Sequence, residues 1–309
     1  MKRLIAIVGP TAVGKSNLAL HLATALDGEI VVADSRQVYR FMDIGTAKPS
    51  REEQALVPYH LIDIVNPNED FSLALYQEMA YKAVEDIQNR NKLAIIEGGT
   101  GLYVWAVLEG FSIPAVPPDP EFRRSLETRA KAQGHEVLYR ELQEKDPTTA
   151  ERIDRRNVRR VIRALEVRRA IGASIPHQRR LQPRWQASIV GLTMERNELY
   201  RRIDSRVERM LEQGFVEEVR WLLKNGYGLE LPAMSSPGYR EIGSYLRGET
   251  TFAEAIWQTK THTHRLARHQ YAWFRLTDKR ISWYDVDEGI DVAAKIVAKN
   301  VLNLEEAQH

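Results

Sequence analysis

Residues 9–16 read Gly-Pro-Thr-Ala-Val-Gly-Lys-Ser and complete the pattern G-x-x-x-x-G-K-[ST], which is typical of a phosphate-binding loop. The apolar run 4–8 precedes the loop and reads as a buried parallel strand, and residues 17 to about 26 have helical periodicity. Because strand, loop and helix follow in this order, we predict that the loop binds a polyphosphate. The residues expected to surround the phosphates are Gly9, Pro10, Thr11, Ala12, Val13, Gly14, Lys15 and Ser16.

The chemistry of this loop follows from its backbone amides and two side chains. Amides at a helix N-terminus attract a di- or triphosphate, Lys15 neutralises its charge, and the Ser16 hydroxyl binds Mg²⁺. Most such loops hydrolyse or transfer the terminal phosphate of a nucleotide. The same cradle holds any ligand that ends in a diphosphate, so the loop alone leaves the reaction open.

The composition of the 309 residues is that of a globular protein, with 43% hydrophobic and 28% charged residues. No apolar stretch approaches the roughly 18 residues of a membrane span, and the first strand begins too close to Met1 for a signal peptide. The absence of cysteine excludes disulfides and cysteine-based zinc sites. We therefore expect a cytoplasmic monomer without membrane contact.

Positive charge is concentrated between residues 151 and 184, where eleven arginines stand against three acids. That segment carries +8, so the rest of a chain with net charge +2 carries −6. A solvated charged face is the ordinary alternative, but so large an excess of one sign repels itself without a partner. We therefore predict nucleic-acid binding through Arg152, Arg155, Arg156, Arg159, Arg160, Arg163, Arg168, Arg169, Arg179, Arg180 and Arg184.

Strand and helix patterns alternate along most of the chain, which predicts an α/β fold with a doubly wound parallel sheet like that of phosphate-loop NTPases. Ligands bind beyond the carboxyl ends of such strands, where Asp34, Thr100 and the phosphate loop lie. We expect these three to meet in one crevice. The predicted strands after the first are 29–33, 93–96, 188–192 and 281–286, and helices begin near Ser72 and cover 197–213 and 215–225. In the helix after Ser72, the residues expected to point inward are Leu75, Met79, Ala83 and Ile87.

A helical insertion interrupts this alternation. A proline-rich segment at 113–120 reads as a linker, and residues 121–182 look purely helical. We therefore divide the chain into a first core part (1–115), a basic helical insertion (116–184) and a second core part (185–309). Within the insertion, helical spacing places on one face Arg152, Arg156, Arg159 or Arg160, and Arg163. The apolar stripe that anchors this helix consists of Val158, Val161, Ile162 and Leu165.

Asp34 is the first candidate for chemistry, and three roles for it remain open. It can be a magnesium ligand, a general base, or the cap of the turn that follows it. Its neighbours Ser35, Arg36 and Gln37 add a hydroxyl, a guanidinium and an amide, which together can recognise a flat polar group.

Further candidates lie at Glu97 and Thr100. Glu97 stands where kinases keep the acid associated with magnesium, or else it is structural and bonded to the turn at 98–99. Thr100 follows two glycines, which let a ligand approach the backbone closely. A metal site is not expected at the histidine cluster, because no carboxylate lies at ligand spacing from His262, His264 and His269.

These motifs together resemble the tRNA dimethylallyltransferases (tRNA isopentenyltransferases) over nearly the whole chain. Besides 9–16, the matching segments are Asp34-Ser35-Arg36-Gln37-Val38-Tyr39, 43–48, Gly98-Gly99-Thr100-Gly101-Leu102-Tyr103, Arg163-Ala164-Leu165-Glu166, Met210, Gly214, Glu217-Glu218-Val219 and Trp273-Phe274-Arg275. Such enzymes transfer a dimethylallyl group from dimethylallyl diphosphate to the exocyclic amine of the adenine on the 3′ side of the anticodon. The resemblance implies that the phosphate loop holds the diphosphate of this donor with Mg²⁺, and that the helical insertion grips the anticodon stem-loop of tRNA.

The resemblance also implies roles for single residues. Asp34 would orient the adenine amine and accept its proton, Thr100 would help to position the base, and Thr11 and Arg196 would contact the diphosphate. A base flipped out of its stack would be held by Asp34, Thr100, Ser35, Arg36 and Gln37. In the insertion, the tRNA-contacting residues would be Arg123, Arg159, Arg160, Val161, Ile162 and Arg163.

Two segments depart from the family pattern. Where the family commonly has Ile-Gly-Tyr, this chain has Pro237-Gly238-Tyr239, and where it commonly has Ala-Lys-Arg-Gln, this chain has Ala267-Arg268-His269-Gln270. The second departure replaces one cation by a titratable imidazole. Both concern contacts with tRNA and leave the predicted chemistry intact.

Three other functions stay open on the residues alone. A kinase acting on a small metabolite explains the loop and Glu97 but gives the arginines no role. Prenylation of free AMP needs the same loop and Asp34 but no basic surface, and a non-enzymatic RNA-binding protein does not need an intact loop. Binding of tRNA that weakens steeply with salt would disfavour the first two.

Overall fold

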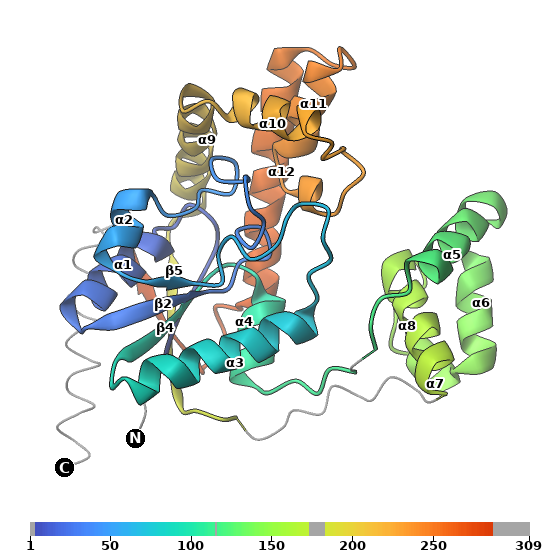
Figure 1. Cartoon of the computed structure of the whole chain (residues 1–309), viewed down its shortest axis with the longest axis horizontal. Helices are drawn as coiled ribbons and strands as arrows, with labels where there is room; N and C mark the ends of the chain where they lie inside the picture. Colours follow the sequence, from blue (N-terminus) through green and yellow to red (C-terminus); the bar gives the residue numbers. More distant parts are fainter. Residues whose placement is uncertain (1–3, 115, 173–182, 287–309) are drawn as a thin grey trace. The chain divides into compact units, whose positions relative to one another are not determined.

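Six parallel strands form one sheet in the order β3-β2-β4-β1-β5-β6 in the computed structural model, which describes residues 4–114, 116–172 and 183–286 (Figure 1). The strands are β1 (Leu4–Val8), β2 (Gly28–Val32), β3 (Tyr59–His60), β4 (Leu93–Glu97), β5 (Ala187–Thr193) and β6 (Ile281–Asp285). Every neighbouring pair runs parallel, so the predicted parallel α/β sheet is confirmed.

The strand order explains why helices cover both faces of this sheet. The chain leaves β1, passes through α1 (Lys15–Ala25) to β2, and then returns through α3 (Leu73–Asn89) to β4, which lies between β1 and β2. Because crossover connections are right-handed, a reversal of direction puts the two helices on opposite faces. Ile5 and Ile7 of β1 pack in one core cluster with Leu18 and Leu22 of α1.

The face of α3 that packs inward is one position away from the predicted face. Ser72 caps the helix as expected, since its side chain accepts a hydrogen bond from the amide of Leu75. The fully buried side chains are Tyr76, Ala80, Val84 and Ile87, whereas Leu75 is 38% exposed. The inward orientation predicted from the sequence is therefore confirmed for Ile87 and wrong for Leu75, while Met79 and Ala83 are only partly buried. The ring of Tyr76 decides the register, because it stacks on Tyr103 with centroids 3.9 Å apart.

Helices above the carboxyl edge of the sheet complete the first unit. A second apolar cluster joins Val38 and Met42, in the loop after β2, to Phe215, Leu222 and Tyr239 of the helical layer. The long helix α12 runs from this layer to the sheet, where it meets α4 (Figure 1). None of the helices in the described ranges is both long and apolar enough to cross a membrane. Besides α1 and α3, the helices of the first unit are α2 (Arg51–Leu56), α4 (Gly101–Leu108), α9 (Arg196–Glu212), α10 (Phe215–Lys224), η1 (Ala233–Ser235), α11 (Tyr239–Leu246) and α12 (Phe252–Trp273).

The chain divides into two compact units, of which the first comprises 1–110 and 183–309 and the second 111–182. In its described residues the second unit is built of helices: α5 (Pro120–Gln133), α6 (Glu136–Lys145), α7 (Pro147–Ala150) and α8 (Val158–Ile171). Its own core contains Leu126, Leu138, Leu142 and Leu165. Residues 115 and 173–182, with Arg179 and Arg180, lie outside the described residues.

The arginine helix of the second unit is shorter than predicted. Asn157 caps α8 by accepting a hydrogen bond from the amide of Arg160, so the helix begins at Val158. Arg152 and Arg156 lie before it, in turns, and the prediction that they share its face was wrong. Asp154 holds Arg156 in the turn before the helix, because both the side chain and the backbone amide of Arg156 donate to its carboxylate.

Candidate active site

The phosphate loop connects β1 to α1 and has the conformation that its glycines allow. Gly14, at the N-cap of α1, has φ of 103°, a left-handed conformation that disfavours side chains with a Cβ. Lys15 opens the helix, and its Nζ donates to the carbonyl of Pro10 at 2.8 Å, across the loop. The side chain of Lys15 is nearly buried, so its positive charge is held inside the loop.

Glu97, the last residue of β4, lies against the start of α1. Its carboxylate accepts a hydrogen bond from the Ser16 hydroxyl at 3.3 Å. Burial raises the pKa of Glu97, and the nearby Lys15 charge partly offsets this effect. Burial likewise lowers the pKa of Lys15, and Glu97 opposes that shift. The two groups therefore form a buried pair of opposite charge at the phosphate loop.

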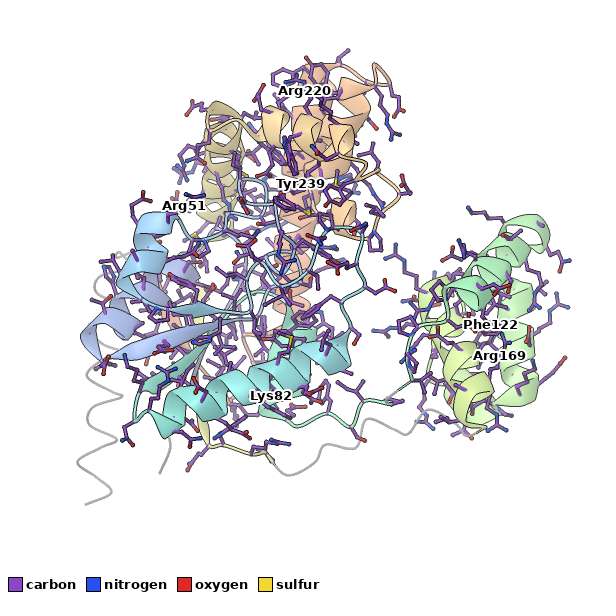
Figure 2. The ribbon with its side chains drawn as sticks, in the orientation of Figure 1. Arg51, Lys82, Phe122, Arg169, Arg220 and Tyr239 are labelled. Atoms are coloured by element: carbon purple, nitrogen blue, oxygen red, sulfur yellow. The ribbon has the colours of Figure 1, made fainter. Side chains whose placement is uncertain are left out.

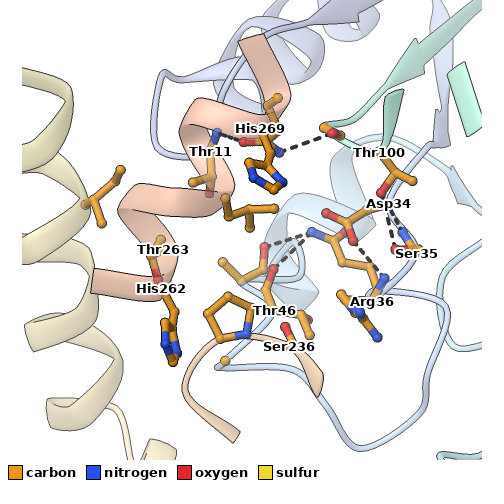
Figure 3. A pocket seen from close by; sticks show the side chains of 18 of the residues that line it. Thr11, Asp34, Ser35, Arg36, Thr46, Thr100, Ser236, His262, Thr263 and His269 are labelled. Atoms are coloured by element: carbon orange, nitrogen blue, oxygen red, sulfur yellow. Dashed lines mark hydrogen bonds between the residues drawn. The ribbon is translucent and has the colours of Figure 1, made fainter. Parts of the chain in front are cut away.

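The segment after β2 carries Asp34 into the same region (Figure 3). One oxygen of Asp34, Oδ1, accepts a hydrogen bond from the amide of Arg36 at 2.8 Å and closes a tight turn. The amide of Ser35, between these two residues, donates to the Thr100 hydroxyl oxygen at 3.0 Å. The Gln37 side chain is buried, and its amide nitrogen donates to the carbonyls of Thr46 and Ala47. These bonds fix the carboxylate of Asp34 relative to the end of β4.

Two cavities meet at the phosphate loop. The smaller has a volume of about 460 Å³ and is lined by Thr11, Lys15, Asp34 and Thr100, so the structure brings the predicted groups together. The larger, about 1140 Å³, is lined by five arginines and by Lys15 and Lys48 among others. Both cavities include Lys15, Ser16, Ala47, Arg206 and Met210 in their walls. Ligands in the two cavities would therefore contact some of the same residues of the phosphate loop and of α9.

Arg206 lies at the two cavities, whereas Arg196, the arginine named from the sequence, does not. Arg206 lines both cavities, and its Nη1 lies 3.4 Å from the Thr11 hydroxyl oxygen. Withdrawal from water lowers its pKa, while the charges of Asp34 and Glu97 act to raise it. Arg196 lines neither cavity and instead donates to the hydroxyl of Tyr200 at 3.2 Å. Both arginines belong to α9, but they are ten positions apart and do not share a face.

Comparison with known proteins identifies the family of the chain. A family model described as IPP transferase matches residues 37–277. The chain belongs to the IPP transferase family. It is 56% identical to the tRNA dimethylallyltransferase of Roseiflexus castenholzii over 273 residues, which are 88% of this chain and 89% of the relative. It is 51% identical to the enzyme of the same name from Thermomicrobium roseum over 288 residues, which are 93% and 87% of the two chains.

Solved structures of IPP transferases have the same fold. The full-length tRNA isopentenylpyrophosphate transferase of Bacillus halodurans is 38% identical, with a TM-score of 0.72 and all of both chains covered. A eukaryotic dimethylallyltransferase, described as acting on tRNA, is 26% identical with a TM-score of 0.77. In that comparison 92% of this chain and 74% of the other are covered.

Gln270 of α12 holds the phosphate loop of this IPP transferase, a role that sequence reasoning missed. Its Oε1 accepts a hydrogen bond from the amide of Thr11 at 2.7 Å, and its Nε2 donates to the carbonyl of Gly99 at 3.2 Å. A Cβ on Gly99 would lie 2.1 Å from that Nε2, so a larger residue there would displace the Gln270 amide. The available signal was the family segment that ends in Gln270, but the sequence does not reveal what the amide contacts.

Glu218 of α10 has a similar role that sequence reasoning also missed. Its carboxylate accepts hydrogen bonds from the amides of Asp43, Ile44 and Gly45 at 2.8, 2.7 and 3.2 Å, and from the Tyr239 hydroxyl at 2.7 Å. Asp43 and Ile44 line the larger cavity and Gly45 lines the smaller. One carboxylate thus shapes a wall of both cavities, which accounts for the family segment at 217–219.

Both segments that depart from the family pattern reach the smaller cavity, through Pro237 and His269, whereas Arg268 does not line it. Pro237, His262 and His269 all line it, and Figure 3 shows His262 and His269 along the same helix, α12. The three histidines have separate surroundings: His262 contacts Glu241, His264 lies 2.9 Å from Asp204, and His269 is exposed at the cavity wall. Within the described residues, no group of three metal-ligating side chains is formed.

In the helical unit the predicted tRNA-binding residues have three different surroundings. Arg159 and Arg160 are exposed on α8. Arg123 and Arg163 are half-buried, and both bind the buried carboxylate of Glu166. The side chains of Val161 and Ile162 are buried in the core of the unit, where they position the helix.

Another cation of the unit is held by an aromatic ring. The Arg169 guanidinium lies over the ring of Phe122, 4.4 Å from its centroid (Figure 2). The ring fixes that charge on the surface of the unit, since a guanidinium is attracted to the face of an aromatic ring.

Proposed function

We propose that this chain transfers a dimethylallyl group from dimethylallyl diphosphate to the exocyclic amine of the tRNA adenine 3′-adjacent to the anticodon, and releases diphosphate. The observation that carries the proposal is the shared wall of the two cavities. A diphosphate bound at the phosphate loop and a base beside Asp34 would lie in neighbouring cavities that are lined in part by the same residues. The relatives named tRNA dimethylallyltransferase support the choice of donor and acceptor.

The donor is held in the larger cavity with its diphosphate at the loop. Loop amides, Lys15 and Arg206 are cationic or hydrogen-bond donors, and further arginines line the same cavity at 51, 201, 202 and 209. As the bond between carbon and oxygen breaks, negative charge grows on the departing diphosphate. Donors that are already in place stabilise that charge without reorganisation, which is commonly the largest single contribution to catalysis.

A magnesium ion fits the oxygen groups beside the loop. The Ser16 hydroxyl and the Glu97 carboxylate are in contact with each other, and Mg²⁺ favours such oxygen ligands together with phosphate oxygens and water. When bound, it neutralises part of the diphosphate charge. Ser16 and Glu97 would hold the ion, and its charge would favour the ionised form of the Glu97 carboxylate, whose pKa is raised mainly by burial.

Asp34 acts as the base that accepts a proton from the adenine amine. Its Oδ1 is already bonded to the Arg36 amide, whereas Oδ2 receives no hydrogen bond from the described residues. The amine nitrogen forms the new bond to the allylic carbon, its proton passes to the Asp34 carboxylate, and the electron pair of the broken bond leaves with diphosphate. Ser35 and Thr100 keep the carboxylate in position, because their hydrogen bond joins its turn to the end of β4.

The tRNA partner is recruited by the arginines of the second unit. Arg159 and Arg160 present charge to solvent, and phosphate contacts of this kind give affinity that falls with salt. We expect the protein to work in the cytoplasm and to act as a monomer, and sedimentation at several concentrations would test the second expectation.

The test is to incubate the protein with undermodified tRNA, Mg²⁺ and radiolabelled dimethylallyl diphosphate, with ATP and AMP as parallel controls. We expect label in tRNA at the adenine after the anticodon, and none in the same tRNA with that adenine replaced by guanine. Label on AMP would indicate a free-nucleotide prenyltransferase, and phosphate transfer from labelled ATP would indicate a kinase. Either result without label in tRNA would contradict the proposal.

A further inference from the structure

A third cavity, of about 540 Å³, lies at the carboxyl end of β5 between α9 and α12. Its volume exceeds that of the cavity beside Asp34, and none of its lining residues lines either of the other two. The proposed reaction uses the carboxyl ends of β1, β2 and β4, so it leaves this edge of the sheet without a role. Carboxyl ends of parallel strands are where open α/β sheets bind ligands.

The floor of this cavity is apolar. Met194 and Leu199 are buried, and Tyr271 is half-buried, while Leu276 lies at the rim and is 57% exposed. A cavity of a few hundred Å³ with an apolar lining and a few polar groups is typical of small-molecule sites.

The polar groups of the cavity are three guanidiniums, from Arg196, Arg268 and Arg275. Arg196 and Arg268 both donate to the hydroxyl of Tyr200, at 3.2 and 3.0 Å. Within the described ranges, none of the three arginines is in an ion pair with a carboxylate. Burial acts to raise the pKa of Tyr200, but the two guanidiniums outweigh it and the pKa is lowered, as expected beside excess positive charge.

Some arginines close in sequence to this cluster are paired with carboxylates, whereas the three exposed arginines of the cavity are not paired with any carboxylate of the described residues. On the same helix as Arg196, the guanidiniums of Arg201 and Arg202 contact Glu198. Close in sequence to Arg275, Arg280 contacts Glu109 and Asp278. Three cations around one apolar floor therefore indicate a site for an anion that also has an apolar part.

We propose that this cavity binds a small phosphate ester with an apolar or aromatic body, held by its phosphate at Arg268 and Arg275 and by its body on Met194, Leu199 and Tyr271. Guanidinium groups suit phosphate because their planar donors pair with two oxygens at once. A nucleoside monophosphate and a prenyl diphosphate both have this chemistry. A backbone phosphate of RNA would use the arginines but leave the apolar floor empty.

Equilibrium dialysis of the full chain with three labelled probes tests the proposal. The probes are AMP, with an aromatic body, geranyl diphosphate, with an aliphatic body, and inorganic diphosphate, which has none. A Lys15→Met background weakens binding at the phosphate loop. In that background we expect one equivalent of AMP or geranyl diphosphate to bind per chain, and inorganic diphosphate to bind more weakly.

Adding Arg268→Gln and Arg275→Gln should then weaken binding of the organic probe by about tenfold or more, because two charge-assisted contacts are lost. The matched control is Arg220→Gln with Arg247→Gln, two arginines that line none of the three cavities and should leave the affinity unchanged. Thermal unfolding of each variant checks that the fold is retained. The affinities of AMP and geranyl diphosphate, compared with each other, show whether the cavity floor prefers an aromatic or an aliphatic body.

Binding of neither organic probe in the Lys15→Met background would overturn the proposal. So would equal binding before and after the two arginine substitutions. If the probes do not bind but the substitutions weaken tRNA binding, the arginines belong to an RNA surface and the small-molecule site is wrong. The outcome is independent of prenyl transfer by the wild-type chain, which is measured separately.

Discussion

The two units of the chain place positive charge in opposite environments. In the first unit Lys15 is nearly buried, and burial lowers the pKa of both Lys15 and Arg206 while Glu97 and Asp34 act in the other direction. In the second unit Arg159 and Arg160 stand in solvent on α8. Charges withdrawn from water interact strongly and at fixed positions, whereas exposed charges are screened within about 10 Å at 0.1 M salt. The first arrangement suits a single diphosphate, and the second suits a long polyanion.

Asp34→Asn should give the largest effect and test the buried side of this comparison. The amide keeps the size of the side chain but cannot accept a proton, so we expect turnover to fall by about 10²–10⁴. Affinity for tRNA should be largely unchanged, because the exposed arginines are intact. Single-turnover transfer and filter binding measure the two quantities. Asp27→Asn, which alters a surface acid bound to Lys92, serves as the control. Near-normal turnover of Asp34→Asn would remove Asp34 from the mechanism.

Gln270→Met should give the second-largest loss of activity. Methionine has nearly the same volume but makes neither the bond to the Thr11 amide nor the bond to the Gly99 carbonyl. Misplacing a reacting group by about 1 Å can cost about 100-fold, so we expect kcat/KM for the donor to fall by about ten- to 100-fold. The dissociation constant for tRNA should stay constant. Gln258→Met on the same helix is the matched control, because among the described residues this glutamine side chain bonds to Glu254, away from the phosphate loop. An equal loss in both variants would mean that the helix is merely destabilised.

Arg159→Glu with Arg160→Glu tests the exposed side. Two phosphate contacts are lost and two repulsions added, so we expect the dissociation constant for tRNA to rise by about tenfold at moderate salt. The slope of log affinity against log salt should decrease by about 2. Donor affinity should not change. Arg140→Glu, an exposed arginine on α6, is the control for net charge. These residues are better targets than Arg163, whose loss would leave the buried carboxylate of Glu166 without one of its cations.

The pH dependence of donor binding should give the smallest effect. Because the pKa of Lys15 lies below its usual value of 10.5, the ammonium loses its proton at a lower pH than an exposed lysine does. KM for the donor should therefore rise at alkaline pH, earlier than ordinary lysine chemistry predicts, and be lowest on the acid side of that transition. In Lys15→Arg the guanidinium stays charged, so the alkaline rise should disappear even if binding is weaker at every pH. A rise that persists in that variant would assign the titration to another group.

The fold and the main site groups were predictable because they depend on short-range patterns. The phosphate loop lies between a strand and a helix that are adjacent in sequence, and Asp34 and Thr100 follow strands whose carboxyl ends must share one edge of a parallel sheet. Strand periodicity and loop composition contain this information. The helices at 196–212 and 215–224 were predicted within one residue for the same reason.

The errors and omissions concern contacts between distant segments. Arg196 and Arg206 belong to one helix, and only the packing of that helix decides which arginine reaches Thr11. Gln270 lies 259 positions from the amide that it binds. On α3 the apolar residues occupy two adjacent faces, so the stacking of Tyr76 on Tyr103 selects the face that is buried. No local pattern in the sequence encodes these choices.

The four hydrogen bonds that end on Glu218 have a consequence for slow motion in the chain. Its carboxylate fastens residues 43–45, which form walls of both cavities, to α10 and to Tyr239 at the start of α11. Local opening of that segment must break these bonds together. A ligand that occupies either cavity should therefore slow amide hydrogen exchange in α10 and α11, although it touches neither helix, and Glu218→Gln should abolish this protection. Mass spectrometry of exchanged peptides from 215–246 would then report occupancy of the site from a distance.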